Sequence, residues 1–537
     1  MEKQNNTILQ TNLFPDSEMN PIQMESRPVS CLGMTFESDE ARREYFRDEL
    51  RTKLPELRRI EGFPVGEDDD IIALSDPPYY TACPNPWLND FIAEWETEKK
   101  QMEAEGKREK DFKVWEPYTS DVSEGKNNPI YNAHSYHTKV PHPAIMRYIL
   151  HYTQPGDIVF DGFCGTGMTG VAAQLCGSQK DVLDLKEKDV QIGVRHAICS
   201  DLSPIASLIA AAYTLKFDPI VFERKATQIL DQVECELGWM YETNVNGKIG
   251  KINYVIWSDV FVCPTCGQEI VLWNESVDIE NETIKDSFPC PNCGTICSKK
   301  NMEKAWITHY DSLLCKTVTL NKKVPVRVNY TLGSRRGEKN IDETDKELLS
   351  KVEGLSPINI STYRMPEGNE ARRNDRIGIT HTHQFYTKRN FIYLNRIFNL
   401  VQGDIFLETW LTSVLLSTTK MNKFRFSGTG ITSGTLYIPS INWEFTPYNT
   451  LKKKITSFLG ISYPNRGYSS VSINSATAIL NLDSSSIDYI FVDPPFGANI
   501  MYSELSSIWE GWIKVQTNNK EEAIICRFQN EVQRFGI

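Results

Sequence analysis

Short apolar runs alternate with helical repeats in two stretches of the chain. After Pro141 the pattern predicts three helices and two strands in alternation, over 143–152, 158–160, 168–175, 196–200 and 204–213. The same texture returns after Ser470, with a strand expected over 489–492 and a helix over 503–515. Short apolar strands that alternate with helices are typical of a parallel sheet in an α/β protein.

The other regions have different patterns. Residues 1–60 are polar, with an exposed helix expected over 38–54, and the density of Glu and Lys over 94–113 predicts a solvated helix with little to bury. Paired cysteines fall within 255–310, and 316–455 is mixed and basic. We therefore expect an accessory region (1–130), the two halves of one α/β domain (131–252 and 466–537), and between them a cysteine-rich insertion (253–312) and a basic region (313–465).

Composition narrows the class of protein. A chain of 537 residues with 40% hydrophobic and 24% charged residues is expected to fold into two or three domains and is neither disordered nor collagen-like. It has no run of the roughly 18 apolar residues that a membrane span needs, and its polar start lacks a secretory signal. We expect a cytoplasmic protein, and the 13 cysteines, an odd number, agree with reduced thiols.

Charge is distributed unevenly. The net charge is -12, yet residues 316–455 contain 22 Lys and Arg against 12 Asp and Glu. A basic segment on an acidic protein is expected where one face meets phosphate. Its cations alternate with aromatic residues: Arg372, Arg373, Lys388, Arg389 and Arg396 with Phe385, Tyr386, Phe391 and Tyr393. Such a mixture suits nucleic-acid contacts, and it equally suits an amphipathic helix with a charged outer face.

The first chemical motif is a glycine-containing turn between a strand and a helix. The run Asp161-Gly-Phe163-Cys-Gly165-Thr-Gly167-Met-Thr169 follows the 158–160 strand, and Asp201 ends the next one. The glycines let the backbone approach a ligand, and a carboxylate after the second strand can accept both hydroxyls of a ribose. The third glycine of a dinucleotide fingerprint and the Gly-Lys-Ser/Thr of a phosphate loop are missing. A single nucleoside with a cationic tail, such as S-adenosylmethionine, therefore fits better than NAD or ATP.

The second motif is Asp493-Pro494-Pro495-Phe496, directly after the 489–492 strand. Consecutive prolines donate no N–H group and hold a rigid turn that exposes the carboxylate and nearby carbonyl oxygens. Those acceptors can hold an exocyclic amine by its hydrogens, while the Phe496 ring offers a face for a planar base. We predict that these four residues are catalytic.

A similar run, Asp76-Pro77-Pro78-Tyr79, competes for that role. If it were catalytic, the second half of the sheet would have to lie between Tyr80 and Pro141, where the pattern has no convincing buried strands. We therefore prefer a surface or target-binding loop for Asp76.

Two cysteine pairs predict a metal site. Cys263 and Cys266, and then Cys290 and Cys293, are each separated by two residues and followed by glycine. This spacing lets four sulfurs reach one tetrahedral Zn²⁺, and four thiolates leave no open coordination position, so the zinc is expected to be structural. Cys297 is expected to be a packed thiol and not a ligand.

These motifs together resemble a known family. The run from Tyr136-His-Thr138-Lys139 to Thr169 is similar to the methyl-donor half of amino-methylating DNA methyltransferases, and Asp493 to Phe496 looks like their catalytic tetrad. With the cysteine pairs, the whole resembles zinc-ribbon-containing adenine-specific DNA methylases. The resemblance implies a Rossmann-like sheet with an inserted zinc ribbon. It also implies S-adenosylmethionine contacts at Thr138, Lys139, Asp161, Phe163, Gly165, Gly167, Thr169 and Asp201.

What the family implies about function is specific. A base flipped out of double-stranded DNA would receive the methyl group on its exocyclic amine, with adenine N6 the expected target, in restriction, phage defence or a mobile element. The alternatives are an RNA base methyltransferase and a catalytically inactive DNA-binding subunit.

Two departures from the family pattern stand out. The fourth tetrad residue is Phe, where Tyr is common, and the chain stops about forty residues after Phe496. The sheet would then be incomplete at its far edge. A truncated chain, a partner polypeptide, or the folding back of the first 130 residues would each account for this.

Overall fold

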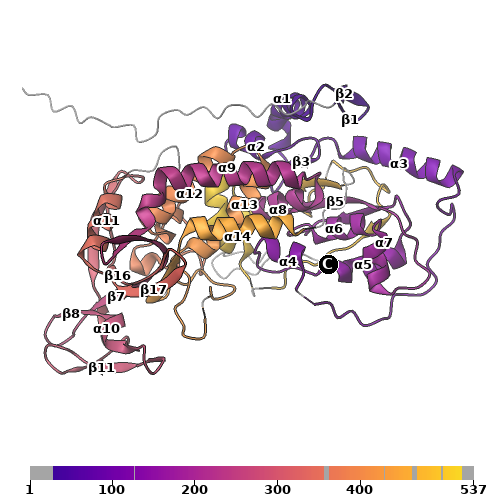
Figure 1. The fold of residues 1–537 in the computed structure, drawn as a ribbon. Helices are drawn as coiled ribbons and strands as arrows, with labels where there is room; N and C mark the ends of the chain where they lie inside the picture. Colours follow the sequence, from indigo (N-terminus) through magenta and orange to yellow (C-terminus); the bar gives the residue numbers. More distant parts are fainter. Residues whose placement is uncertain are drawn as a thin grey trace, which may run out of the picture.

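The computed structural model describes residues 28–125, 127–355, 362–428, 430–461, 469–479, 481–497 and 500–522. Within these ranges one hydrophobic cluster extends from Cys31 to Val515, and a second, smaller one surrounds the cysteine pairs. Helices and strands of the first cluster fill the upper and right parts of Figure 1, and the cysteine-rich lobe lies at the lower left. No helix in the described part of the chain has both the length and the hydrophobicity that a membrane crossing requires.

A five-stranded parallel sheet forms the centre of the α/β part. Its strands run in the order β20 (Tyr489–Ile490), β4 (Ile158–Asp161), β5 (His196–Asp201), β19 (Ser469–Ile473) and β3 (Tyr80–Thr81). β20 lies beside β4, with Tyr489 opposite Val159, although more than three hundred residues separate them in the sequence. Every residue of β4 and of β19 is buried, as expected for strands covered on both faces.

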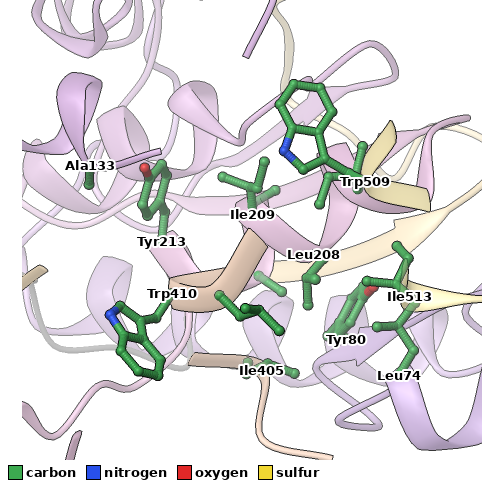
Figure 2. Packing of buried hydrophobic residues seen from close by; sticks show 14 of the residues in the cluster. Leu74, Tyr80, Ala133, Leu208, Ile209, Tyr213, Ile405, Trp410, Trp509 and Ile513 are labelled. Carbon is green, nitrogen blue, oxygen red and sulfur yellow. The ribbon is translucent and has the colours of Figure 1, made fainter. Parts of the chain in front are cut away.

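Four helices that accompany these strands lie close to their predicted positions: α5 (His142–Tyr152), α6 (Met168–Leu175), α8 (Pro204–Thr214) and α15 (Tyr502–Ile513). A further helix, α7 (Gln179–Leu185), was not predicted. All eleven residues of α8 are buried, because α8 lies between the sheet and a second layer of helices. Figure 2 shows Leu208 and Ile209 of α8 between the indole rings of Trp410 and Trp509.

The second helical layer comes from both sides of the cysteine-rich insertion. It consists of α9 (Pro219–Leu237), α12 (Lys388–Val401), α13 (Ile405–Leu415) and α14 (Pro447–Leu459), with the short α4 (Pro129–Ala133) and α11 (Glu343–Glu353) at its margins. The Trp410 indole N–H donates to Leu451 O at 3.0 Å and that of Trp509 to Thr412 O at 3.0 Å. Both indole N–H groups therefore have partners, so these two large core side chains are buried without loss of hydrogen bonds.

An antiparallel sheet connects this body to the cysteine-rich lobe. The fifteen-residue β7 (Lys248–Val262) is its spine, paired with β16 (Lys323–Leu332), β18 (Ile441–Phe445), β6 (Glu242–Val245), β8 (Glu269–Val271) and β13 (Glu303–Lys304), while β17 (Arg335–Asn340) pairs with β16. The lobe itself contains α10 (Leu272–Ser276) and the strands β9 (Val277–Asp278), β10 (Thr283–Ile284), β11 (Ser287–Pro289) and β12 (Ile296–Ser298). The hairpin of β14 (Trp306–Asp311) and β15 (Lys316–Asn321) follows it.

The N-terminal region is more integrated than the sequence pattern suggested. It comprises β1 (Val29–Cys31), β2 (Met34–Phe36), α1 (Asp39–Leu57), α2 (Asp68–Leu74), β3 and α3 (Leu88–Ala104). We predicted an exposed helix over 38–54 and a solvated helix over 94–113, and both predictions are wrong about burial. α1 buries Phe46, Leu50 and Leu54, and α3 buries Phe91 and Trp95, because the apolar residues of each helix share one face that packs on the main cluster.

The fold-back of this region reaches the sheet at an unexpected edge. β3 pairs with β19, with Val471 opposite Tyr80, so the N-terminal region extends the side of the sheet away from β20. In the described residues β20 is the opposite edge strand, and Ile490 is exposed there. Among the described residues of this region, 28–125 and 127–130, none forms a strand beside β20, so the prediction that the N-terminal region completes that edge is not met by them.

Candidate functional site

A cavity of about 570 Å³ opens where four of the five parallel strands end. Such an edge is where α/β sheets bind ligands, because the loops after neighbouring strands diverge there. The predicted residues that line it are Thr138, Lys139, Asp161, Phe163, Gly165, Thr169, Asp201, Asp493, Pro494, Pro495 and Phe496. The two motifs separated by more than three hundred residues therefore share one cavity.

The glycine-containing turn is held by the carboxylate that precedes it. Asp161 accepts the Phe163 N–H at 3.0 Å and the Thr169 hydroxyl at 2.5 Å, which ties both ends of the turn to the end of β4. Gly165 has φ +50° and lines the cavity, and a Cβ at this position would meet only the Tyr136 ring, at 3.9 Å.

Gly167, predicted as a cofactor contact, is not among the residues that line the cavity. It precedes α6 with φ +74°, and a Cβ at this position would lie 2.8 Å from Ala210 Cα. Its place in the structure is close packing of the turn against α8.

Asp201 closes the opposite side of the turn. Its carboxylate accepts the Gly165 N–H at 2.8 Å and the Ser203 N–H at 2.9 Å. Burial raises the pKa of Asp201 to about 6 and the pKa of Asp161 to about 7, and the negative charges of Asp201 and Asp493 add to the shift at Asp161. The pocket therefore concentrates negative charge that a cationic ligand would stabilise.

This charge arrangement predicts a pH dependence of ligand binding. A cation stabilises the ionised carboxylates, so affinity for S-adenosylmethionine is expected to fall about tenfold or more as the pH is lowered from 7.5 to 5, through the raised pKa values of Asp161 and Asp201. Binding near pH 6.5 should release protons, which calorimetry in buffers of different ionisation enthalpy measures. Asp161→Asn should flatten the profile, and affinity that rises at low pH would contradict the assignment.

The segment before α5 contributes two of the predicted residues, Thr138 and Lys139. The Thr138 hydroxyl lies 2.9 Å from the Tyr502 hydroxyl of α15, which brings the two halves of the domain together over the cavity. Lys139 donates to Tyr131 O at 2.5 Å and to His134 O, both at the end of α4. Burial and the nearby Lys454 charge lower the pKa of Lys139 to about 7. In this arrangement Lys139 braces the segment as well as lining the cavity.

The corner Asp493–Phe496 follows β20 directly. The Phe491 N–H donates to Phe160 O at 3.0 Å, so the chain still follows β4 two residues before the corner. Asp493 is exposed, and Phe496 is 74% exposed with its ring at the cavity. An uncovered ring beside an accessible carboxylate is the geometry that a flipped base would need.

Asp76 occupies a different place from the one predicted. It lies before β3, at the edge of the sheet opposite β20, and is only 8% exposed. Its carboxylate accepts from Arg42 at 2.8 Å and from Arg43 at 3.0 Å, and these charges lower its pKa against the effect of burial. The prediction of a surface loop is wrong here, since α1 covers the turn with its arginines. Asp76 is not among the residues that line the cavity.

The cavity also contains residues that sequence reasoning missed. Glu522 lines it and accepts the Ser503 N–H at 2.9 Å, at the start of α15. Asn474, Ser475 and Thr477 line it from the turn after β19. The position directly after a parallel strand was a usable signal for the second set. The sequence around Glu522 contained no such signal, because only the turn after α15 brings this residue back to the cavity.

The four predicted cysteines form one cluster. All four sulfurs lie within 4.8 Å of one another, with Cys263 Sγ 3.7 Å from Cys293 Sγ and Cys266 Sγ 3.7 Å from Cys290 Sγ. Zn–S bonds of about 2.3 Å in a tetrahedron give sulfur separations of about 3.8 Å. Each pair ends in a turn where a glycine N–H, of Gly267 or Gly294, donates to the first cysteine carbonyl. The donor set is compatible with a structural zinc ion.

The basic residues named in the sequence analysis form ion pairs with carboxylates of the same chain. Arg389 is buried against Glu444, Arg396 pairs with Glu236, and Lys388 pairs with Glu353. Arg372 pairs with Glu367 and Arg373 with Glu370. The aromatic residues among them are core residues: Phe385, Tyr386, Phe391 and Tyr393. Of the two interpretations of this group, the structure gives little support to nucleic-acid contacts, because α12 packs against α9, α13 and β18 and its cations meet carboxylates of this chain.

Taken together, the fold and cavity define an α/β protein with a central parallel sheet and a cavity at the carboxyl edge of that sheet. A family model described as "DNA methylase" matches residues 66–201, which contain both Asp76 and the glycine-containing turn. The match supports an N6/N4 DNA methyltransferase, and it indicates an S-adenosylmethionine-dependent enzyme that methylates adenine N6 or cytosine N4 of DNA. A search of curated proteins and a search of solved structures each found no match.

Proposed function

We propose that the chain methylates the N6 amine of adenine in double-stranded DNA, with Asp493, Pro494, Pro495 and Phe496 as the catalytic corner. The observation that carries this proposal is the shared cavity, in which the Asp161–Thr169 turn and Asp201 face the corner across one space. Because more than three hundred residues separate the two motifs in the sequence, their meeting at one cavity argues that they act together.

The roles follow from the side chains. Asp201 and Asp161 provide acceptors and negative charge for the ribose and the cationic tail of the methyl donor, which supplies a methyl carbon bonded to a positively charged sulfur. Phe496 stacks on the extruded base, and Asp493 with the Pro494 carbonyl accepts the amine hydrogens. The amine lone pair forms the new N–C bond as the C–S bond breaks, and the amine then loses one proton toward Asp493 or solvent.

The assignment of the catalytic acid favours Asp493 over Asp76 on geometry. Asp493 is accessible at the cavity, whereas Asp76 is committed to two arginines at the other edge of the sheet. The cysteine cluster, with Cys263, Cys266, Cys290 and Cys293 as ligands, is proposed to hold a structural Zn²⁺.

The function is tested by supplying a labelled methyl donor with unmethylated duplex DNA, with structured RNA, and with neither. We expect label in duplex DNA, recovered as N6-methyladenine after digestion to nucleosides. N4-methylcytosine as the product would overturn the choice of base, and label confined to RNA would reject the DNA assignment. If calorimetry detects no binding of the methyl donor at high protein concentration, the chain acts as an inactive DNA-binding subunit instead.

A further inference from the structure

Two cations of the basic region face outward. Lys423 and Arg425 are exposed, and no carboxylate pairs with either of them in the part of the chain that the structure describes. Both lie in the segment that joins α13 to β18. Their state contrasts with that of Arg389 and Arg396, which are occupied by Glu444 and Glu236.

The backbone of this segment is fixed at its base. The Phe424 N–H donates to Ile441 O at 3.1 Å and the Trp443 N–H to Asn422 O at 2.9 Å, so the segment is added as a further strand beside β18. Phe424 and Phe426 pack into the hydrophobic cluster of the cysteine-rich lobe. Because side chains alternate along an extended chain, Lys423 and Arg425 then point to the opposite, solvent side.

A third cation lies close to this pair. Lys299 of the cysteine-rich lobe has its pKa lowered by burial and next by the positive charge of Lys423. The negative charges of Asp259 and Asp286 oppose that effect, and Asp259 is itself bound to Lys304 and to Lys323, the latter at 2.8 Å. Cations that repel one another at a shared edge are stabilised by an anion from outside the chain.

The tip that follows is built from small residues. Gly428, Gly430 and Gly434 have no atom within 4 Å of the position a Cβ would take, and Ser427 and Ser433 are exposed. A phosphodiester can approach backbone N–H groups and hydroxyls at such a tip without meeting side chains. Figure 1 shows an orange loop of this part of the sequence projecting from the body on the side of the cysteine-rich lobe.

The return limb of the loop is tied to the catalytic edge. Glu370 accepts the Thr435 hydroxyl at 2.5 Å and the Leu436 N–H at 3.1 Å. The backbone N–H groups of Glu370 and Ala371 in turn donate to the Glu504 carboxylate at 2.7 and 2.9 Å. Glu504 lies on the first turn of α15, next to Tyr502 and Ser503 of the cavity. A chain of hydrogen bonds therefore connects the loop, through Glu370, to the first turn of α15 beside the cavity.

We propose that the basic loop, residues 423–428 and 430–436, grips the sugar–phosphate backbone of duplex DNA beside the flipped base, with Lys423 and Arg425 as the phosphate contacts and Lys299 supporting them. The inference rests on the proposed function and adds to it a surface that binds DNA phosphates without regard to base sequence. The hydrogen bonds from Thr435 to Glu370, and from the Glu370 backbone to Glu504, fix the position of the loop relative to the cavity.

The test is the variant Lys423→Ala/Arg425→Ala in the full chain, with Lys452→Ala/Lys453→Ala as the matched control, because those two exposed lysines lie on α14. DNA affinity is measured by fluorescence anisotropy on one labelled duplex between 50 and 300 mM salt. Loss of two phosphate contacts is expected to weaken binding roughly tenfold and to reduce the slope of log K against log salt by about 2. Affinity for S-adenosylmethionine and the melting temperature should stay at wild-type values.

The outcomes separate the two proposals. An unchanged affinity and salt slope in the loop variant, with a wild-type protein that binds and methylates DNA, overturns the loop assignment alone. An equal loss in the α14 control also overturns it, since the effect would then reflect net charge. A wild-type protein that neither binds nor methylates DNA rejects the proposed function itself.

Discussion

Asp493→Ala is expected to lower the rate of methyl transfer by roughly 10³-fold. In the proposed function the Asp493 carboxylate holds the amine, and no other acid in the described residues lies at the corner after β20. Affinity for S-adenosylmethionine should change by less than about threefold, because the donor contacts are expected on the Asp161 and Asp201 side. Single-turnover rates with saturating DNA, combined with calorimetry, measure both quantities.

Asp76→Ala provides the contrast, since this residue belongs to the competing Asp-Pro-Pro run. Removing Asp76 leaves the buried Arg42 with only the half-exposed Asp39 as its charge partner and is expected to cost about 3 kcal/mol of stability. The folded variant should still transfer methyl groups at near wild-type rates, and Asp493→Asn should remain inactive. If Asp76→Ala abolished transfer in folded protein while Asp493→Ala did not, the roles of the two motifs would be reversed.

Cys290→Ser is expected to remove the bound metal and unfold the cysteine-rich lobe. Structural zinc contributes about 10 kcal/mol to the folding of small metal modules, and Cys290 also belongs to the small hydrophobic core of this lobe. Metal analysis should find one zinc per wild-type chain and none in the variant, with a lower first melting transition. DNA affinity should fall with it, because the base of the basic loop packs on the same core.

Cys297→Ser is the matched control for the metal site. Cys297 is a fully buried thiol of the same core and is not one of the four clustered sulfurs. It should keep its zinc and show at most a moderate loss of stability. Equal loss of metal from both variants, or retention in Cys290→Ser, would contradict the four-cysteine assignment.

Much of the fold around the cavity was predictable because its signals are local. Apolar runs bounded by Asp161, Asp201 and Asp493 marked three parallel strands and the residues at their ends. The spacing of the cysteine pairs likewise determined which sulfurs meet, since two intervening residues suffice for both thiols of a pair to reach one ion.

The failures concern residues whose surroundings come from distant segments. Arg389 and Phe391 suggested a nucleic-acid surface by composition, yet Glu444 and Trp512 enclose them. Charge density along the sequence does not distinguish a cation that meets a carboxylate across the fold from one that meets solvent. Asp76 was misplaced for the same reason, because its partners come from the helix Asp39–Leu57.

The sequence by itself determined which reactive groups this protein has: a glycine-containing turn after a strand, two carboxylate-diproline corners and four paired thiols. Only the tertiary structure separated the two corners, because strand order places Asp493 beside β4 and Asp76 at the opposite edge. It also decided which cations remain free for a partner. Strand neighbours and ion pairs are formed between segments hundreds of residues apart, so local periodicity contains no record of them.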